Sequence, residues 1–236
     1  MGFRLLLCVC PILALFAAGA ARAADKVEGS LNFNFYPYLS QVTSDADFTL
    51  NAAATLPAGL SYASFVNFTG VFRDTGMQMQ NSEQNLRWAF SPRIPFDAAV
   101  QAQIGPKNGD DTWQVGPRWR INDTPFLRGI FAALHVSWNV TFFQRFDNAE
   151  GSVRQISNNY RVSFPYLSDR LYLSGYLDRG IHHGGRRGRV HLDNTETQLG
   201  VRLVGNVYAI AEYRRNEYRA TDRDNLAVGL EFKSRW

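Results

Sequence analysis

The chain has little cysteine, and it has no long apolar run beyond its first 23 residues. Both cysteines, Cys8 and Cys10, lie within that N-terminal stretch. Once the stretch is removed, the remaining chain holds no disulfide and no thiolate metal site. No later segment approaches 18 uninterrupted apolar residues, which argues against a transmembrane helix. The sequence also lacks nucleotide-binding loops and zinc motifs, so we expect no cofactor and no metal.

Residues 1–23 have the three parts of a secretory signal. Arg4 supplies a positive charge, residues 5–16 form an apolar segment, and Ala21-Arg22-Ala23 is a small-x-small cleavage box. The alternative is a membrane-anchoring helix, but the apolar segment is short for a bilayer, which needs about 20 residues. We therefore expect a signal peptide over 1–23 and one mature domain over 24–236.

The formal net charge of +4 is carried mainly by arginine. Positive charge can indicate nucleic-acid binding, but an exported protein rarely meets nucleic acid. We therefore expect no nucleic-acid partner.

The dominant pattern beyond residue 23 is alternation with a period of two, which is typical of β-strands. In residues 112–121, "TWQVGPRWRI", tryptophan and valine alternate with glutamine and arginine. About twelve such segments follow one another, and most are near the 9–11 residues that a tilted strand needs to cross a bilayer. They lie roughly at 30–38, 46–56, 60–72, 84–91, 96–105, 112–121, 129–144, 153–164, 170–179, 190–203, 207–215 and 224–236.

The connections between these segments alternate in length. Tight turns follow most even-numbered segments, at 57–59, 91–95, 165–169 and 204–206. Longer polar stretches follow odd-numbered segments, such as "RDTGMQMQNSEQ", "RGIHHGGRRGR" and "RNEYRATDRD". Short turns on one side and longer loops on the other are typical of outer-membrane barrels. An even number of strands places both termini on the short-turn, periplasmic side.

A soluble β-sandwich also alternates and is the alternative fold. Its outer face is expected to be rich in Lys and Glu, whereas the polar face here carries Gln, Asn, Ser, Thr and Arg, which suits an enclosed lumen. Aromatic residues also lie near segment ends, as interfacial girdles require. They are Tyr38, Tyr62, Trp88, Trp113, Trp119 and Trp236.

The fold class predicted is therefore all-β. It is a transmembrane, antiparallel, up-and-down β-barrel of about 12 strands, with short periplasmic turns and longer extracellular loops. Closure is required because every backbone N–H and C=O group inside lipid needs a partner.

Residues 129–146, "GIFAALHVSWNVTFFQRF", contain a His-x-Ser pair, His135 and Ser137. The pair resembles that of the outer-membrane phospholipase A family, whose barrels carry a His, a Ser and a partner Asn on the lipid-facing side. Alternation here predicts that both side chains face the lumen, together with Asn159 of the next strand. The family's Ser-Asn-Gly sequence is also missing, because Trp138 follows the serine. We interpret the pair as part of the barrel wall, and a lipid hydrolase as the less favoured alternative.

The inner face of the predicted barrel is rich in charged side chains, and two interpretations stay open. One is a network of ion pairs that braces or plugs the barrel. The other is a selectivity lining, in which an excess of arginine favours anionic or polar solutes. Tyrosine rings on this face either stack flat solutes such as nucleobases or pack the wall. The candidate lumen residues are Arg118, Arg120, His135, Arg161, Tyr172, Tyr176, Asp178, Arg202, Glu212 and Arg214.

His182-His183 lies in a predicted external loop beside Arg186, Arg187 and Arg189. Metal or anion capture at the barrel mouth is one interpretation. Adjacent histidines point in different directions and make a poor metal site. We therefore favour a solvated loop that contacts lipopolysaccharide phosphates.

The order of several segments resembles a known family. "GPRWRIND", "LHVSWNVTFFQRF", "NNYRVSFPYLSDRLYLSGYLDRG", "VYAIAEYRRNEY" and "NLAVGLEFKSRW" are similar to the second half of the Tsx-like, nucleoside-specific channels. The resemblance covers roughly residues 116–236, and the Gly-Tyr-x-Asp segment at 175–178 is the most similar part of it. It implies a small, monomeric, twelve-stranded outer-membrane channel that passes nucleosides.

We therefore expect a porin of a Gram-negative outer membrane. It would allow small polar solutes, such as nucleosides or anions, to cross by passive diffusion. The alternative is a closed barrel with a structural or surface-interaction role. The expected partners are outer-membrane lipids, lipopolysaccharide, the barrel-assembly machinery that recognises the terminal aromatic Trp236, and the solute. The chain is expected to be a monomer and not an enzyme.

Overall fold

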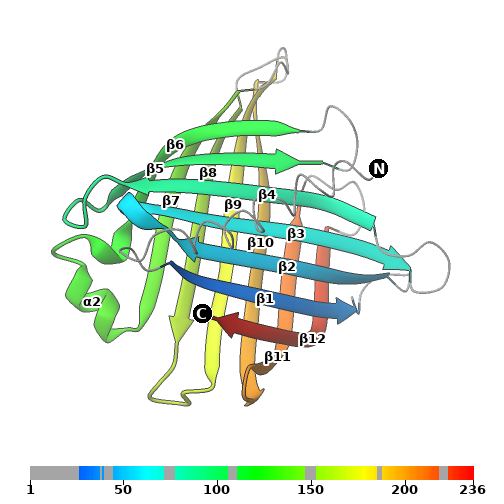
Figure 1. Cartoon of the computed structure of the whole chain (residues 1–236). Coiled ribbons are helices and arrows are strands. Elements are labelled where there is room, and N and C mark those ends of the chain that lie inside the picture. The colour runs from blue at the N-terminus through cyan, green and yellow to red at the C-terminus, as the bar shows by residue number, and fades with distance from the viewer. Residues whose placement is uncertain are drawn as a thin grey trace.

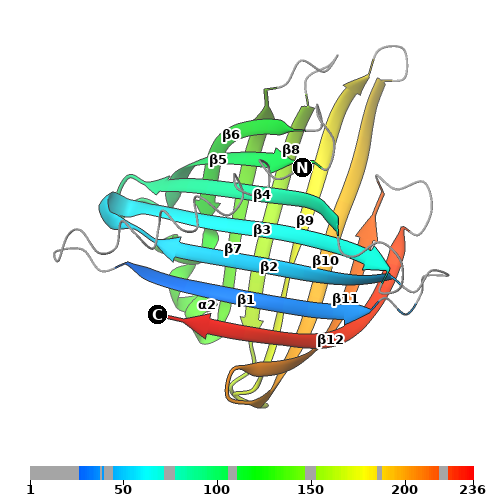
Figure 2. The same ribbon diagram turned by 45° about the vertical axis from the view of Figure 1, so that its right-hand side comes forward.

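The computed structural model describes residues 27–37, 39, 45–71, 78–105, 111–146, 153–184, 188–217 and 223–236. The expected signal peptide, 1–23, lies outside these residues. Over the described residues, twelve strands form one closed antiparallel barrel in which each strand pairs with its neighbours in sequence (Figures 1 and 2). The predicted fold class is confirmed.

The first six strands are β1 (Glu28–Pro37), β2 (Asp45–Thr55), β3 (Leu60–Val71), β4 (Gln78–Ala89), β5 (Phe96–Ile104) and β6 (Thr112–Arg120). The other six are β7 (Val136–Arg145), β8 (Val153–Ser163), β9 (Leu171–Gly184), β10 (Gly188–Val204), β11 (Val207–Asn216) and β12 (Asp224–Arg235). Short helical segments are η1 (Pro57–Gly59), η2 (Ile121–Asp123) and α2 (Arg128–Ala133). No helix among the described residues is both long and apolar enough to span a membrane.

The barrel closes where β1 pairs with β12, and the last residue completes this seam. The Gly29 N–H donates to the Trp236 carbonyl at 3.0 Å, and the Trp236 N–H donates back at 3.1 Å. The indole of Trp236 lies over Gly29, where an added Cβ would come within 2.3 Å of the ring. Closure leaves no unpaired sheet edge, which is a requirement for strands in lipid.

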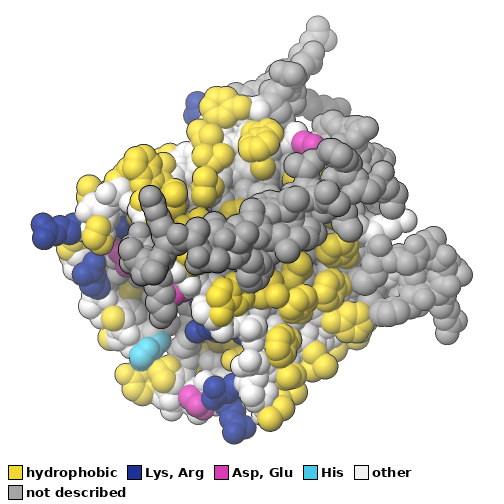
Figure 3. Space-filling view, in the orientation of Figure 1, with side chains coloured by type: hydrophobic (Ala, Val, Ile, Leu, Met, Phe, Trp, Pro, Cys, Tyr) yellow, Lys and Arg dark blue, Asp and Glu magenta, His cyan; other side chains and the backbone are white. Residues whose placement is uncertain are grey.

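Alternation divides the side chains of each strand between two faces. In β6, Trp113 is 58% exposed, whereas its neighbour Gln114 is 2% exposed. Large apolar side chains are exposed on the outer face of many strands, and Figure 3 shows them gathered over the barrel wall. The inner face instead buries polar groups such as Thr49, Gln101 and Glu212. This barrel is therefore apolar outside and polar inside, the reverse of a soluble protein.

One end of the barrel carries the turns after β2, β4, β6, β8 and β10, together with the start of β1 and the end of β12; we call it the short-turn end. Gly205 has a positive φ of 51° in the two-residue turn after β10, a conformation that glycine adopts without strain. The opposite end is the long-loop end. The loops expected there lie largely outside the described residues.

The strand predicted over 129–144 is wrong in its first half. Residues 128–133 form helix α2 at the short-turn end, and β7 begins at Val136. The apolar residues of this stretch fit a period of two and a helix equally well, a known ambiguity of short apolar runs. The helix follows a turn in which the Thr124 carbonyl accepts from Leu127 and Arg128, and α2 makes this short-turn connection longer than predicted.

The hairpin of β9 and β10 extends further than predicted. It reaches Gly184 and Gly188, so His182-His183 belongs to a strand rather than a loop. A bidentate ion pair joins the directly opposed residues Arg179 and Asp193, with both N···O distances at 2.8 Å. This cross-strand pair fixes the register at the base of the extended part of the hairpin.

Candidate functional site

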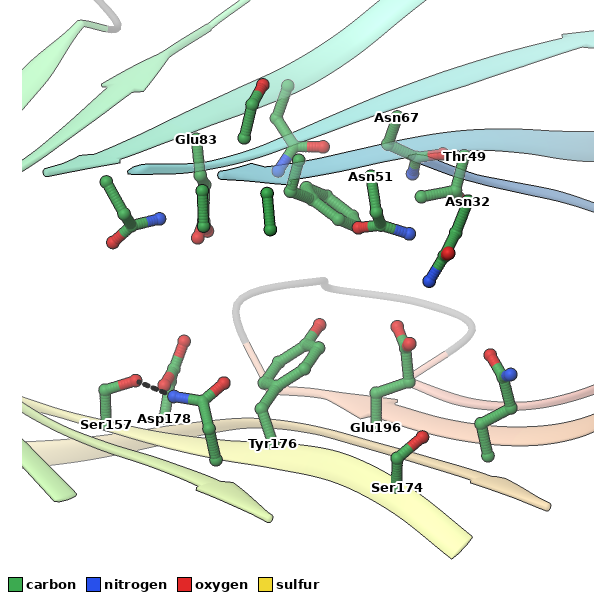
Figure 4. A pocket seen from close by; sticks show the side chains of 18 of the residues that line it. Asn32, Thr49, Asn51, Asn67, Glu83, Ser157, Ser174, Tyr176, Asp178 and Glu196 are labelled. Atoms are coloured by element: carbon green, nitrogen blue, oxygen red, sulfur yellow. Dashed lines mark hydrogen bonds between the residues drawn. The ribbon is translucent and has the colours of Figure 1, made fainter. Parts of the chain in front are cut away.

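A polar cavity of about 610 Å³ lies inside the barrel. Asn51 and Glu83 project into it from one wall, and Tyr176, Asp178 and Glu196 project from the facing wall (Figure 4). Asparagines make up much of the lining: Asn32, Asn34, Asn51, Asn67, Asn81, Asn85, Asn159, Asn194 and Asn216. The cavity therefore offers more neutral hydrogen-bonding side chains than charged ones.

Small residues make room for the cavity. Ser30, Ala53 and Ala63 are cross-strand partners on the inner face of β1, β2 and β3, and all three line the cavity. On the facing wall, Tyr176 projects into the cavity. The small side chains of β1, β2 and β3 thus leave empty volume on one side of the lumen.

Amide side chains on the inner face of β4 and β5 are linked to one another. The Gln101 Nε2 donates to Asn85 Oδ1 at 3.0 Å and to Glu83 Oε2 at 3.2 Å. Gln103 Nε2 donates to the other carboxylate oxygen of Glu83 at 3.4 Å. These contacts hold the Glu83 side chain in place without giving it a positively charged partner.

Two aromatic rings line the cavity from opposite sides. Phe65 lies on β3 and Tyr176 lies on β9, six strands apart in the barrel order. The Tyr176 hydroxyl accepts from Asn194 Nδ2 at 3.4 Å. Rings on facing walls provide apolar surfaces on which a flat or ring-shaped solute can stack.

Arg214 is the centre of a buried ion-pair cluster at the long-loop end of the cavity. Its guanidinium lies 3.2 Å from Asp47, 3.1 Å from Glu196 and 3.2 Å from Glu212, and also donates to the Tyr36 hydroxyl at 3.2 Å. The cluster joins β1, β2, β10 and β11 across the inside of the barrel. Both predicted residues, Glu212 and Arg214, therefore have bracing contacts, although only Arg214 lines the cavity.

Tyr172 is the centre of a second cluster, nearer the short-turn end. The Lys233 ammonium lies 3.6 Å from the centre of its ring, and the Arg161 guanidinium lies 4.2 Å from it. The Tyr172 hydroxyl donates to Glu231 and accepts from Gln198. Arg161 also lines the cavity, whereas Tyr172 is buried in the wall.

The other predicted arginines lie at the short-turn end, away from the cavity lining. Arg118 pairs with Asp97 at 2.8 Å, and Arg120 pairs with Asp97 at 3.4 Å and with Asp123 at 3.2 Å. Arg202 reaches Asp169 in the turn after β8 at 2.7 Å. Each of these arginines thus has a carboxylate partner.

His135 is placed outside the lumen, contrary to the prediction. It follows α2 with a left-handed φ of 52°, and its ring packs edge-on against Tyr166, with centroids 5.7 Å apart. Because the residue ends a helix instead of continuing a strand, the period-two argument does not apply to it. The His-x-Ser pair therefore forms no site with Asn159, which lines the cavity.

Sequence reasoning missed Glu83, the carboxylate on the wall that faces Asp178. The predicted strand began at residue 84 and assigned the preceding polar residues to a loop, whereas β4 begins at Gln78. Apart from Met79, residues 78–85 are polar on both faces, so their alternation is weak. One signal could have found Glu83. It lies three positions before Leu86, and an odd spacing along a strand places two side chains on opposite faces. Because Leu86 faces outward, Glu83 faces the lumen.

A further polar cluster lies at the rim of the long-loop end. Arg215 Nη2 contacts Glu217 Oε1 at 2.8 Å, and the Asp193 N–H donates to Glu217 Oε2 at 3.1 Å. These contacts, the arginine foremost, lower the pKa of the Glu217 carboxyl. These non-covalent contacts connect β10 and the end of β11 at the rim.

The described residues contain no group of three His, Cys, Asp or Glu side chains arranged to hold a metal ion. No protein-family model matches the chain, and no curated protein sequence matches it. The resemblance to the Tsx-like family therefore stays a prediction.

Solved porin structures share the fold. A NanC porin matches with a TM-score of 0.57 and 7% sequence identity, over 86% of this chain and 98% of its own. A KdgM porin matches with a TM-score of 0.52 and 11% identity over the same shares, and the KdgM porin in complex with disordered oligogalacturonate matches with a TM-score of 0.51. These similarities concern porin channels, not enzymes, and at such identities they show the shared fold.

Proposed function

We propose that the protein is a passive diffusion channel for small polar solutes in the outer membrane of a Gram-negative bacterium. The observation that carries this proposal is the polar cavity enclosed by a closed barrel whose outer face is apolar. The hydrocarbon core of a membrane would contact this outer face, since exposure of so many apolar side chains to water is unfavourable in free energy. The porin fold of the similar structures supports the same assignment.

The short-turn end faces the periplasm in this proposal, and the long-loop end faces the exterior, as in other outer-membrane barrels. Lipid tails contact the apolar belt, and lipopolysaccharide contacts the outer rim. In this proposal the chain acts as a monomer, as the resemblance to the Tsx-like channels implies. The barrel-assembly machinery recognises the terminal Trp236 during insertion.

Ring-shaped polar solutes are the class that fits the cavity. Phe65 and Tyr176 offer stacking surfaces, and the asparagines offer donors and acceptors for hydroxyl groups. Nucleosides and sugars both combine a ring with hydroxyls, and one similar porin is named in complex with oligogalacturonate. Binding has to be weak at each contact, because a tight site would stop flux.

A closed structural barrel is the second candidate. The ion pairs around Arg118, Arg120 and Lys233 favour it, since they fill the short-turn half of the lumen with paired side chains. A channel requires that these pairs leave a continuous aqueous path beside them.

A liposome-swelling assay on refolded 24–236 distinguishes the two candidates. We expect glucose and adenosine to enter protein-containing liposomes faster than empty ones, and a larger trisaccharide to enter more slowly. Swelling rates equal to those of empty liposomes, with folded protein present, would favour the structural barrel.

A further inference from the structure

Carboxylates outnumber cations in one part of the lumen. Among the described residues, five acidic side chains lie on the inner face from the middle of the barrel to its long-loop end, and two arginines lie on the same part of the face. The acidic residues are Asp47, Glu83, Asp178, Glu196 and Glu212, and the arginines are Arg145 and Arg214. We call this region the acidic half of the lumen.

Arg214 is already shared among several carboxyl groups. Arg214 contacts Asp47, Glu196 and Glu212 at 3.1–3.2 Å, so one positive charge faces three carboxyl groups. The other cavity arginines lie toward the short-turn end, where Arg161 stacks on Tyr172. In the part of the chain that the structure describes, the acidic half therefore holds more carboxyl groups than cationic groups.

Glu83 and Asp178 face each other across the cavity (Figure 4). Glu83 accepts from Gln101 and Gln103, and Asp178 accepts from Ser157 and Gln155. No ion pair involves either residue in the described part of the chain. Arg87 also lines the cavity, and its charge interacts with both Asp97 and Glu83.

Buried oxygen atoms along the cavity add an independent observation. Asn34 and Asn67 are each 5% exposed, and the Oδ1 atom of each has no hydrogen-bond partner among the protein groups. Their amide nitrogens are engaged, with Gln198 and Asp47 respectively, which fixes the oxygens as the free atoms. Asp178 Oδ1 and Asn194 Oδ1 also lack a partner. All four are acceptors, so the group that completes the site is a hydrogen-bond donor.

We propose that the cavity prefers cations and binds solutes that join a polar ring to an ammonium group, the class of amino sugars. The ammonium lies between Glu83 and Asp178, and the ring lies beside Tyr176 and Phe65. This inference rests on the proposed channel function. It reverses the preference for anionic solutes that the arginine content of the inner face suggests.

Reversal potentials and sugar block in planar bilayers test the proposal. In a KCl gradient we expect the wild-type pore to favour K⁺ over Cl⁻. Glucosamine is expected to reduce the K⁺ current more than glucose does, and galacturonate, which carries the opposite charge, is expected to reduce it least. The double variant Glu83→Gln/Asp178→Asn, which keeps side-chain size, should lower the K⁺ preference and the glucosamine effect by about fivefold.

Asp224→Asn is the matched control. Asp224 is an exposed carboxylate that bonds the outward-facing Tyr213, so its loss removes one charge without touching the cavity. Its selectivity should equal that of the wild type. A wild-type pore that favours Cl⁻ or galacturonate, or a double variant with unchanged selectivity, would overturn the amino-sugar site while leaving the channel intact. A folded barrel with no conductance would overturn the channel and this inference together.

Discussion

Arg214 is a residue whose contacts join strands on both sides of the β1–β12 seam. Arg214 is 6% exposed, and its guanidinium contacts three carboxyl groups from β2, β10 and β11. A buried charge pair is weak evidence for stability in itself, but removal of one partner leaves uncompensated charge. Here one substitution would leave three carboxyl groups without their cation.

Arg214→Met is therefore expected to lower the free energy of unfolding by about 3–5 kcal/mol. Urea titration in detergent, with the gel mobility of the folded barrel as readout, measures this loss. Arg202→Met is the control, because the Arg202–Asp169 pair is exposed and contributes less than about 1 kcal/mol. Equal stability of the Arg214 variant and the wild type would show that the cluster does not brace the barrel.

Strand pairing between β6 and β7 depends on a glycine. A Cβ added at Gly116 would lie 1.7 Å from the Phe142 carbonyl oxygen, a contact with rigid backbone. The next residue, Pro117, has no N–H to donate, and the pairing of β6 with β7 skips both positions. The two strands therefore approach closely where a side chain has no space.

Gly116→Val should destabilise the barrel by about 3 kcal/mol, since overpacked backbone has to shift. The fraction of protein that refolds into detergent, seen as a gel mobility shift, reports this effect. Gly129→Val is the matched control, because a Cβ at Gly129 meets nothing within 4 Å. A Gly116 variant that refolds as well as this control would refute the steric argument.

At the scale of the whole barrel, the features that depend on neighbouring residues in the sequence could be predicted. Alternation indicates which side chains face lipid, because neighbouring positions on a strand face opposite ways, and it predicted the strands. Of the predicted lumen residues, Arg161, Tyr176, Asp178 and Arg214 line the cavity. It failed at His135, where a short apolar run formed a helix, and at Glu83, where both faces of the strand are polar. Contacts across the lumen, such as Arg214 with Asp47, were beyond prediction because 167 residues separate the partners. Such pairs depend on the register of every strand between them.

The central claim, that the cavity belongs to an aqueous path through the barrel, is tested most directly by single-channel conductance of refolded 24–236 in planar bilayers. We expect discrete steps, and we expect Ala53→Trp, which fills the cavity from its small-residue wall, to reduce them several-fold. Val100→Trp, on the outer face, should leave the steps unchanged. The absence of steps from a properly folded wild-type barrel, or steps that Ala53→Trp does not alter, would contradict this account.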